Sequence, residues 1–155
     1  MTAIKKTNIT GRRNMRDVDP NWFTGRVWAK SISDVVGSMN HDIYHVHFES
    51  GSRTKLHSHN GGQTLMVTAG NGSLVTFEKS GRKTKRGFAI KRTKSVKLGE
   101  GDVVYIPPNV LHAHGSVSED ETFSHVAINL LPRKSSVYRT VWYESDFRKH
   151  VSGIV

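Results

Sequence analysis

Three side chains that could bind a metal ion cluster in the stretch Gly51–Gly70. His57 and His59 lie two residues apart, and Gln63 follows four residues later. Residues two apart in a strand point to the same face, so the two imidazoles can be directed at one point. The turn sequence Asn60-Gly61-Gly62 would reverse the chain and bring Gln63 back beside them. Two ring nitrogens and one amide oxygen converging from a hairpin form three sides of a metal site.

The spacing of this pair is weak evidence by itself, because His45-Val46-His47 has the same spacing. Between Ile43 and Glu49 the apolar side chains alternate with the two histidines, which places His45 and His47 on the face opposite the apolar one. The apolar face is expected to pack on the core. We therefore interpret these two histidines as outward-facing surface residues.

Further histidines occur about 50 residues downstream. His112 and His114 share a face if their strand is regular, so one can bind a metal while the other stays free as an acid or base near neutral pH. In the last long strand, His125, Ala127 and Asn129 form a face that is too polar for a plain core and suits a cavity wall. We hypothesise that His114 or His125 moves a proton while a metal holds a substrate oxygen or an anion.

The elements that must position these side chains are short strands with Gly, Asn and Pro turns between them. Almost no segment has a helical period, which predicts an all-β sandwich or barrel. Thr64 to Ala69 is expected to be a strand, closed by a turn at Gly70-Asn71-Gly72 and followed by its hairpin partner, Ser73 to Glu78. Only Glu144 to Val151 is predicted to form a short helix, with Ser145 as its N-cap.

The chain length and charge pattern suggest one domain with two basic segments. The 155 residues suit a single folded unit, here residues 21–155, preceded by a flexible basic arm over residues 1–20. The formal charge is +10, and residues 79–97 contain nine Lys or Arg and no acid, which predicts a basic hairpin insertion. The chain has no cysteine, no apolar signal core and no membrane-length apolar run, so we expect a cytoplasmic protein that does not contact a membrane.

Two motifs in the order and spacing seen here give the chain a specific resemblance to the cupins, which are small double-stranded β-helix (jelly-roll-like) barrels. The first cupin motif is Gly, five residues, His-x-His, three residues, Glu, six residues, Gly, and it is matched from Gly51 to Gly70 with Gln63 in the Glu position. The second motif is Gly, five residues, Pro-x-Gly, two residues, His. It is matched from Gly101 to His112 with Asn109 in the Gly position, and asparagine is a natural substitute where a turn needs positive φ.

Within the cupins, the sequence resembles a small bacterial-type subgroup that uses Gln as a metal ligand. That subgroup includes manganese-dependent hydroxynitrile lyases and carboxymuconolactone-decarboxylase-like cupins. The resemblance implies a divalent transition metal, Mn²⁺ or Fe²⁺ first, with Ni²⁺, Co²⁺ or Zn²⁺ also compatible. It also implies a homodimer. The implied metal ligands are His57, His59, Gln63 and His112, the implied unligated histidines beside the metal are His114 and His125, and the implied cavity lining is Tyr44, Val46 and Thr54.

The chemistry of the ligand set favours one function among several. Replacing Glu by Gln removes a negative charge, so the metal would be a stronger Lewis acid and less suited to redox cycling. We therefore expect a lyase, of hydroxynitrile lyase or decarboxylase type, acting on a small organic oxygen compound. The alternatives are a dioxygenase if the metal is iron, and a non-enzymatic cupin that binds a small molecule. The basic segments could bind nucleic acid or another polyanion, but Phe88 is the lone aromatic residue of the insertion, which favours a solvated hairpin instead.

Overall fold

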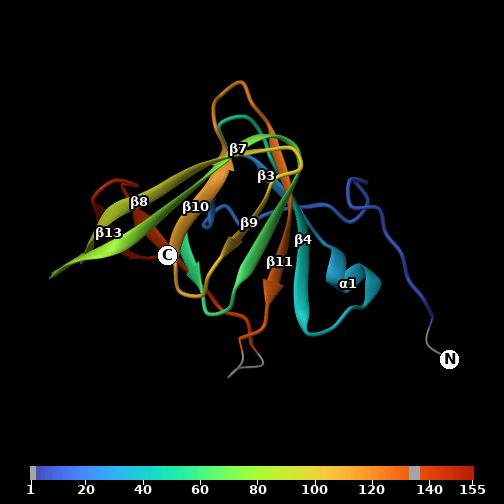
Figure 1. Ribbon diagram of the computed structural model, residues 1–155, viewed down its shortest axis with the longest axis horizontal. Helices are drawn as coiled ribbons and strands as arrows, with labels where there is room; N and C mark the ends of the chain where they lie inside the picture. The colour runs from blue at the N-terminus through green and yellow to red at the C-terminus, as the bar shows by residue number, and fades with distance from the viewer. Residues whose placement is uncertain (1–2, 133–136) are drawn as a thin grey trace.

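The computed structural model, which describes residues 3–132 and 137–155, consists of two antiparallel β-sheets that share one long strand (Figure 1). The first sheet has the order β1 (Arg16–Asp17), β3 (Val27–Ser31), β4 (His41–Phe48), β11 (Phe123–Leu130), β7 (Gln63–Thr84) and β9 (Val103–Ile106). From β7 the second continues through β8 (Gly87–Gly99), β13 (His150–Ile154), β12 (Thr140–Ser145), β6 (Leu56–His59), β10 (Leu111–Ser116), β5 (Arg53–Thr54) and β2 (Phe23–Thr24). The all-β prediction is confirmed.

The space between the two sheets holds the main core. Its buried side chains come from both motifs and from the strands around them: Val27, Val46, Phe48, Leu65, Val67, Leu74, Leu98, Ile106, Phe123 and Ala127. Alternation along β4 and β11 sends every second side chain into this space. A smaller cluster of Leu56, Phe77, Ile90, Leu111 and Val151 lies where β8 and β13 meet.

The predicted turn at Gly70-Asn71-Gly72 is wrong, because β7 runs through it as one strand. Gly70 has φ 74°, and a Cβ there would lie 2.0 Å from the Thr122 carbonyl oxygen, so only glycine fits. A register shift in β11 between Ser124 and His125 accompanies this bend. The bend carries β7 from the first sheet into the second instead of reversing it. The expected positive φ at Asn109 is confirmed at 65°.

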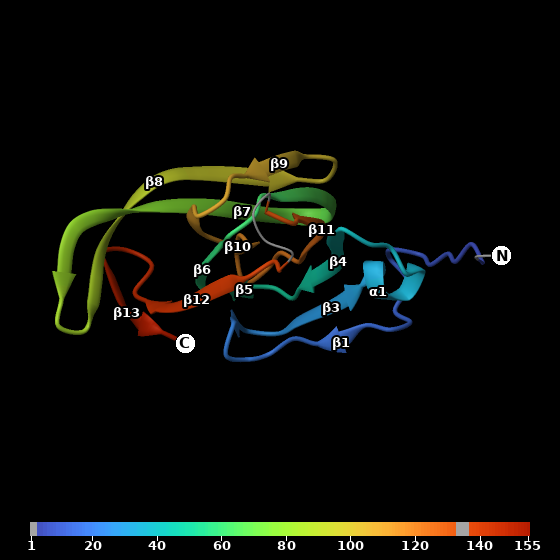
Figure 2. The same cartoon turned by 90° about the horizontal axis from the view of Figure 1, so that it is seen from below.

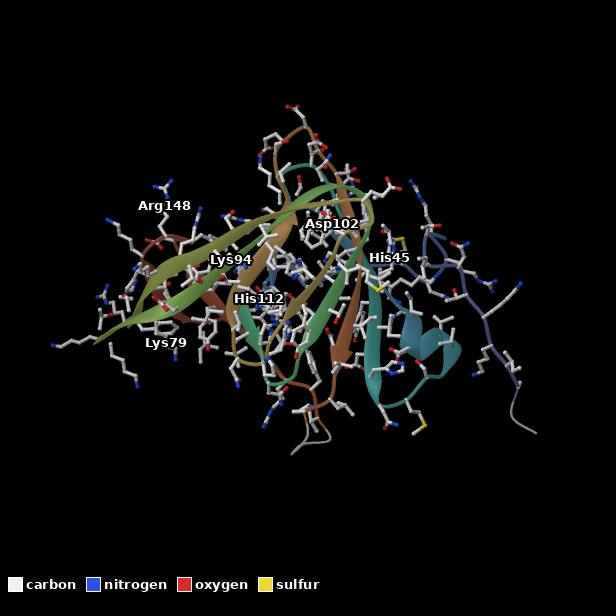
Figure 3. The ribbon with its side chains drawn as sticks, viewed as in Figure 1. His45, Lys79, Lys94, Asp102, His112 and Arg148 are labelled. Atoms are coloured by element: carbon white, nitrogen blue, oxygen red, sulfur yellow. The ribbon has the colours of Figure 1, made fainter. Side chains whose placement is uncertain are left out.

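Beyond the bend, β7 and β8 form a long hairpin whose end projects from the barrel (Figure 2). The basic residues 79–97 lie along this hairpin, and we call them the basic ribbon; Lys94 and Lys97 pair with the part of β7 that also pairs with β10, and the earlier residues extend toward the projecting end. Lys79 and Lys94 are labelled on it in Figure 3, whereas His112 lies inside the barrel. The described lysine and arginine side chains of the ribbon are exposed.

The predicted C-terminal helix is also wrong, since residues 140–154 form the β12–β13 hairpin. In the loop, the Asp146 carboxylate accepts hydrogen bonds from the backbone N–H groups of Arg148, Lys149 and His150 at 2.8–3.0 Å. Strand pairing with β6 and β8 outweighs a weak local helical tendency. The helix of the described chain is α1 (Ile32–Val36), capped by Ser31. It is too short to cross a bilayer, and no helix among the described residues is long and apolar enough to do so.

The basic arm packs on the barrel over the residues described. Arg16 and Asp17 form β1 against β3, and the ammonium of Lys30 donates hydrogen bonds to the carbonyl oxygens of Asn8 at 2.5 Å and Gly11 at 3.4 Å. The arm covers part of the outer face of β3 and β4. As a result His45 is only 5% exposed, so its interpretation as a surface residue is wrong.

Candidate metal centre and the cavity beside it

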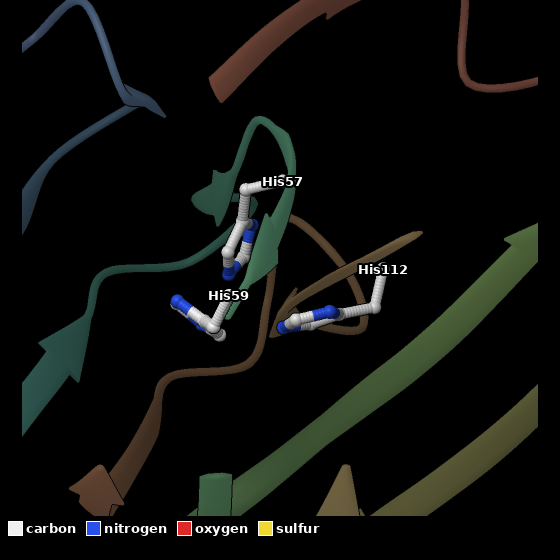
Figure 4. A group of neighbouring side chains, drawn as sticks. All are labelled: His57, His59 and His112. Carbon is white, nitrogen blue, oxygen red and sulfur yellow. The ribbon is translucent and has the colours of Figure 1, made fainter. Parts of the chain in front are cut away.

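Three buried histidines converge inside the barrel (Figure 4). His57 and His59 come from β6, and His112 comes from β10, directly opposite His57 in the antiparallel register. One ring nitrogen from each lies within 4.8 Å of the others. His57 and His59 both point inward because they belong to the same face of β6. The backbone N–H of Asn109 donates a 2.7 Å hydrogen bond to the His59 carbonyl, and this bond connects the second motif to the first.

Hydrogen bonds fix the orientation of each imidazole. His57 Nδ1 lies 2.9 Å from the Lys55 carbonyl, and His112 Nδ1 lies 2.8 Å from the Val110 carbonyl. A carbonyl only accepts, so these Nδ1 atoms carry the proton and each Nε2 keeps a free lone pair. His59 Nδ1 lies 2.8 Å from Thr140 Oγ1. Such bonds on the distal nitrogen are typical of histidines that bind metals.

Gln63 supplies an oxygen beside these rings. It begins β7, is 5% exposed, and its Nε2 donates a 2.8 Å hydrogen bond to Oδ1 of Asn129 on β11. That bond leaves Gln63 Oε1 buried and without a partner among the described residues, as are His59 Nε2 and His112 Nε2. Buried polar atoms are rarely left unpaired. The donor set therefore fits a divalent transition-metal ion, and the three histidines could hold one.

The protonation state of the rings agrees with this use. Burial lowers the pKa of His59 to about 3 and that of His112 to about 4, and burial together with the neighbouring His112 and His59 rings lowers the pKa of His57 well below 6.5. All three are therefore neutral near pH 7. A metal can bind neutral imidazole without first displacing a proton.

His114 and His125 form a hydrogen-bonded pair next to this group. His114 Nδ1 lies 3.2 Å from His125 Nε2, and both side chains are buried. The His114 ring stacks on the His112 ring, with centroids 5.8 Å apart. Burial, followed by the charge of nearby His125, lowers the pKa of His114 well below 6.5, and burial lowers that of His125 to about 3. Two neutral imidazoles thus lie beside the candidate ligands.

A cavity of about 460 Å³ opens next to these side chains, within the range of roughly 300–1,000 Å³ common for small-molecule sites. The expected lining residues Tyr44, Val46 and Thr54 all line it, as do His114 and His125. Thr54 Oγ1 also accepts a 3.1 Å hydrogen bond from the His114 backbone N–H. The candidate site residues of the sequence therefore line one cavity, except His112, whose ring packs against the His57 and His114 rings.

Sequence reasoning missed the contribution of the C-terminal segment. Thr140 orients His59, the Tyr138 ring lies over His59 with centroids 5.0 Å apart, and the Trp142 ring stacks on His57 at 4.3 Å. Thr140 and Trp142 lie two residues apart in β12 and so share a face of that strand, and Tyr138 precedes the strand in the same alternation. That alternation was the available signal, but no motif indicated that this face pairs with β6.

The chain belongs to the cupin family: the family model for cupins matches residues 33–143. Among curated proteins it is similar to an (R)-mandelonitrile lyase of Granulicella tundricola, with 32% identity over 108 residues, covering 70% of this chain and 71% of that protein.

The chain is also similar to solved structures with the cupin fold. A cupin-like protein of Thermotoga maritima is 36% identical, with a TM-score of 0.61 over 83% of this chain and 84% of the other. Oxalate decarboxylase of Bacillus subtilis is 21% identical, with a TM-score of 0.54 over 76% of this chain, which spans only 27% of the decarboxylase. That last similarity concerns the fold alone.

Proposed function

We propose that this protein is a metal-dependent lyase that cleaves a small cyanohydrin into a carbonyl compound and hydrogen cyanide. The main supporting observation is the amide of Gln63, whose N–H₂ donates to Asn129 and whose buried, unpaired oxygen belongs to the cavity lining that also contains His57 and His59. Similarity to a mandelonitrile lyase over most of both chains supports this choice of reaction. We propose Mn²⁺ or Fe²⁺ as the ion, with Mn²⁺ first.

All four proposed ligands, His57, His59, Gln63 and His112, are uncharged. When bound, the ion would supply a Lewis acid whose full positive charge stabilises negative charge developing on a substrate oxygen. A carboxylate in the position of Gln63 would cancel part of that charge. The neutral amide therefore favours an electrophilic role over a redox one.

His114 is proposed to move the proton. Its neutral imidazole takes the hydroxyl proton of the cyanohydrin, the bond between the carbinol carbon and the nitrile carbon breaks, and the electron pair leaves with cyanide. The carbinol carbon becomes the carbonyl carbon, and the proton passes to cyanide to give hydrogen cyanide. His125, 3.2 Å from His114, holds the ring in place and shares its proton.

The remaining lining sets the shape of the substrate site. Val46 and the Trp22 and Phe23 rings provide apolar surface, while Thr54 and Tyr44 provide hydroxyl groups at the cavity wall. Trp22 stacks on Trp142 at 5.4 Å, which makes one wall rigid and flat. A compact aromatic cyanohydrin such as mandelonitrile suits a cavity of this size and lining.

The test is benzaldehyde release from mandelonitrile by protein stripped with a chelator and reloaded with Mn²⁺, Fe²⁺ or Zn²⁺. We expect cleavage to return with Mn²⁺ or Fe²⁺ and to fall by at least tenfold in Gln63→Glu, which is matched in size and retains an oxygen ligand. No cleavage with any ion would refute the reaction. Equal rates in Gln63→Glu would refute the role of the neutral amide.

A second role, in binding nucleic acid, is favoured by the basic ribbon. Its described cations are exposed, and among the described residues none of them forms an ion pair with a carboxylate. A two-stranded ribbon has the width of a DNA major groove, and exposed Lys and Arg contact phosphates. We propose that the ribbon attaches the protein to nucleic acid while the barrel carries the chemistry.

A further inference from the structure

A second cavity, of about 480 Å³, lies on the outer face of the first sheet, and we call it the outer cavity. It exists because β4 alternates: Tyr44 and Val46 point into the barrel, whereas His45 and His47 point to the opposite side. Trp28 of β3 and Ser124 of β11 extend its floor, and Arg12 and Met15 of the arm close over it. Figure 3 labels His45 between the sheet and the arm.

The floor of the outer cavity carries an unpaired buried nitrogen. His45 is 5% exposed; its Nε2 lies 3.3 Å from Thr68 Oγ1, and its Nδ1 is buried with no partner among the described residues. An unsatisfied buried group of this kind is costly unless something binds it. His47, by contrast, is fully engaged, with Nδ1 2.6 Å from Ser124 Oγ and Nε2 3.3 Å from Glu49 Oε1.

The charge around His45 is positive. Lys30, 1% exposed, pairs with His45 in the β3–β4 register, and its ammonium donates to two backbone carbonyls but meets no carboxylate among the described residues. Arg12 adds a second cation in the wall. Among the lining residues Glu49 is the single acid, and it already faces His47. A buried cation without a counter-charge favours an anionic neighbour.

We propose that the outer cavity binds a small organic carboxylate, with its oxygens beside His45 and Arg12 and its apolar part against Met15, Ala69 and Trp28. The positive potential of Lys30 selects the anion, and the apolar wall selects a ligand with a hydrocarbon body. This site is separate from the metal centre, because it uses the opposite faces of the same strands. It does not depend on the reaction proposed above.

The three tryptophans of the chain allow a direct test. Trp28 lines the outer cavity, whereas Trp22 and Trp142 line the barrel cavity. In protein labelled with 5-fluorotryptophan, titration with benzoate should shift the Trp28 fluorine resonance in a saturable way. Benzamide, which has the same shape but no charge, should bind at least tenfold more weakly, since a hydrogen bond to a charged group is worth about 1.5–3 kcal/mol.

Two variants locate the binding. Ala69 is exposed at the cavity edge, so Ala69→Phe should fill the space without disturbing the core and abolish the Trp28 shift. Arg12→Gln should weaken benzoate by about tenfold and leave benzamide unchanged. Both variants should keep the metal content and lyase rate of the parent protein.

Three outcomes would overturn the proposal. The first is a Trp28 resonance that does not move at tens of millimolar benzoate. The second is a shift confined to Trp22 and Trp142, which would place benzoate in the barrel. The third is equal binding of benzoate and benzamide.

Discussion

Asn129 decides which end of the Gln63 amide faces the histidines, and replacing it should weaken metal binding without touching a ligand. Its Oδ1 accepts the 2.8 Å bond from Gln63 Nε2, and both side chains are less than 10% exposed. Asn129→Leu keeps the approximate size but removes the acceptor. The Gln63 amide then either rotates, presenting its N–H₂ to the metal, or leaves that group buried and unpaired.

The expected losses of metal affinity and of folding free energy can both be estimated. Loss of a partner that orients a metal ligand typically costs 10- to 100-fold in affinity, equivalent to about 1.4–2.8 kcal/mol. A buried donor left unsatisfied costs about 1–3 kcal/mol of folding free energy. We therefore expect Asn129→Leu to bind Mn²⁺ 10- to 100-fold more weakly and to be destabilised without metal by about 1–3 kcal/mol.

The assay is Mn²⁺ titration by calorimetry or electron paramagnetic resonance, paired with urea unfolding of the metal-free protein. Asn129→Asp is the matched control, because its carboxylate still accepts from Gln63 Nε2 and should hold the amide in the same orientation. Parent-like Mn²⁺ affinity in Asn129→Leu would refute the reasoning. An equal loss of affinity in Asn129→Asp would show that the hydrogen bond is not what matters.

Three further predictions concern catalysis, pH and the basic ribbon. His114→Ala and His125→Ala should each retain the parent metal content but lower mandelonitrile turnover, by about 10²–10⁴-fold for a lost proton-transfer group; unchanged turnover in both would refute their role. The buried histidines, with pKa values of about 3 for His59 and His125 and about 4 for His112, stay neutral when folded but bind protons near 6.5 when unfolded. The free energy of unfolding of the metal-free protein should therefore be highest above pH 6.5 and should decrease as the pH falls toward 3–4, by up to about 1.4 kcal/mol per histidine per pH unit. Urea unfolding midpoints that agree at pH 7.5 and 5.5 would contradict this expectation. A variant with four ribbon cations changed to Gln should bind a 20-bp DNA duplex at 50 mM salt far more weakly than the parent protein; the four are Lys83, Lys85, Arg86 and Lys91. The control changes four arm cations to Gln (Lys5, Lys6, Arg13 and Arg16) and should reduce binding much less. Equal reductions in the two variants would mean that only net charge matters.

The candidate ligands were predictable from sequence because the information is local. His57, His59 and Gln63 lie within one strand and turn, and the positive φ that the Asn109 position requires could be inferred from residue type. Asn129 was recognisable as part of a polar strand face. Its hydrogen bond to Gln63 was not, because that bond depends on the register between β11 and β7.

The errors have the same physical origin. Gly70-Asn71-Gly72 has the composition of a turn, but positive φ at Gly70 serves equally to bend a strand, and only the β11 partner distinguishes the two. The burial of His45 depends on where the arm packs, and the arm has no apolar pattern that predicts its position. Thr140 and Trp142 reach the candidate metal centre through pairing with a strand more than 80 residues earlier.

The central claim is that the four neutral side chains hold one catalytic metal ion, and titration of turnover with metal tests it most directly. Chelator-stripped protein should show no mandelonitrile cleavage. Cleavage should rise linearly with added Mn²⁺ and stop at one ion per chain, while His112→Ala should stay inactive under the same conditions. Cleavage by the stripped protein, or full activity of His112→Ala with Mn²⁺, would contradict the account.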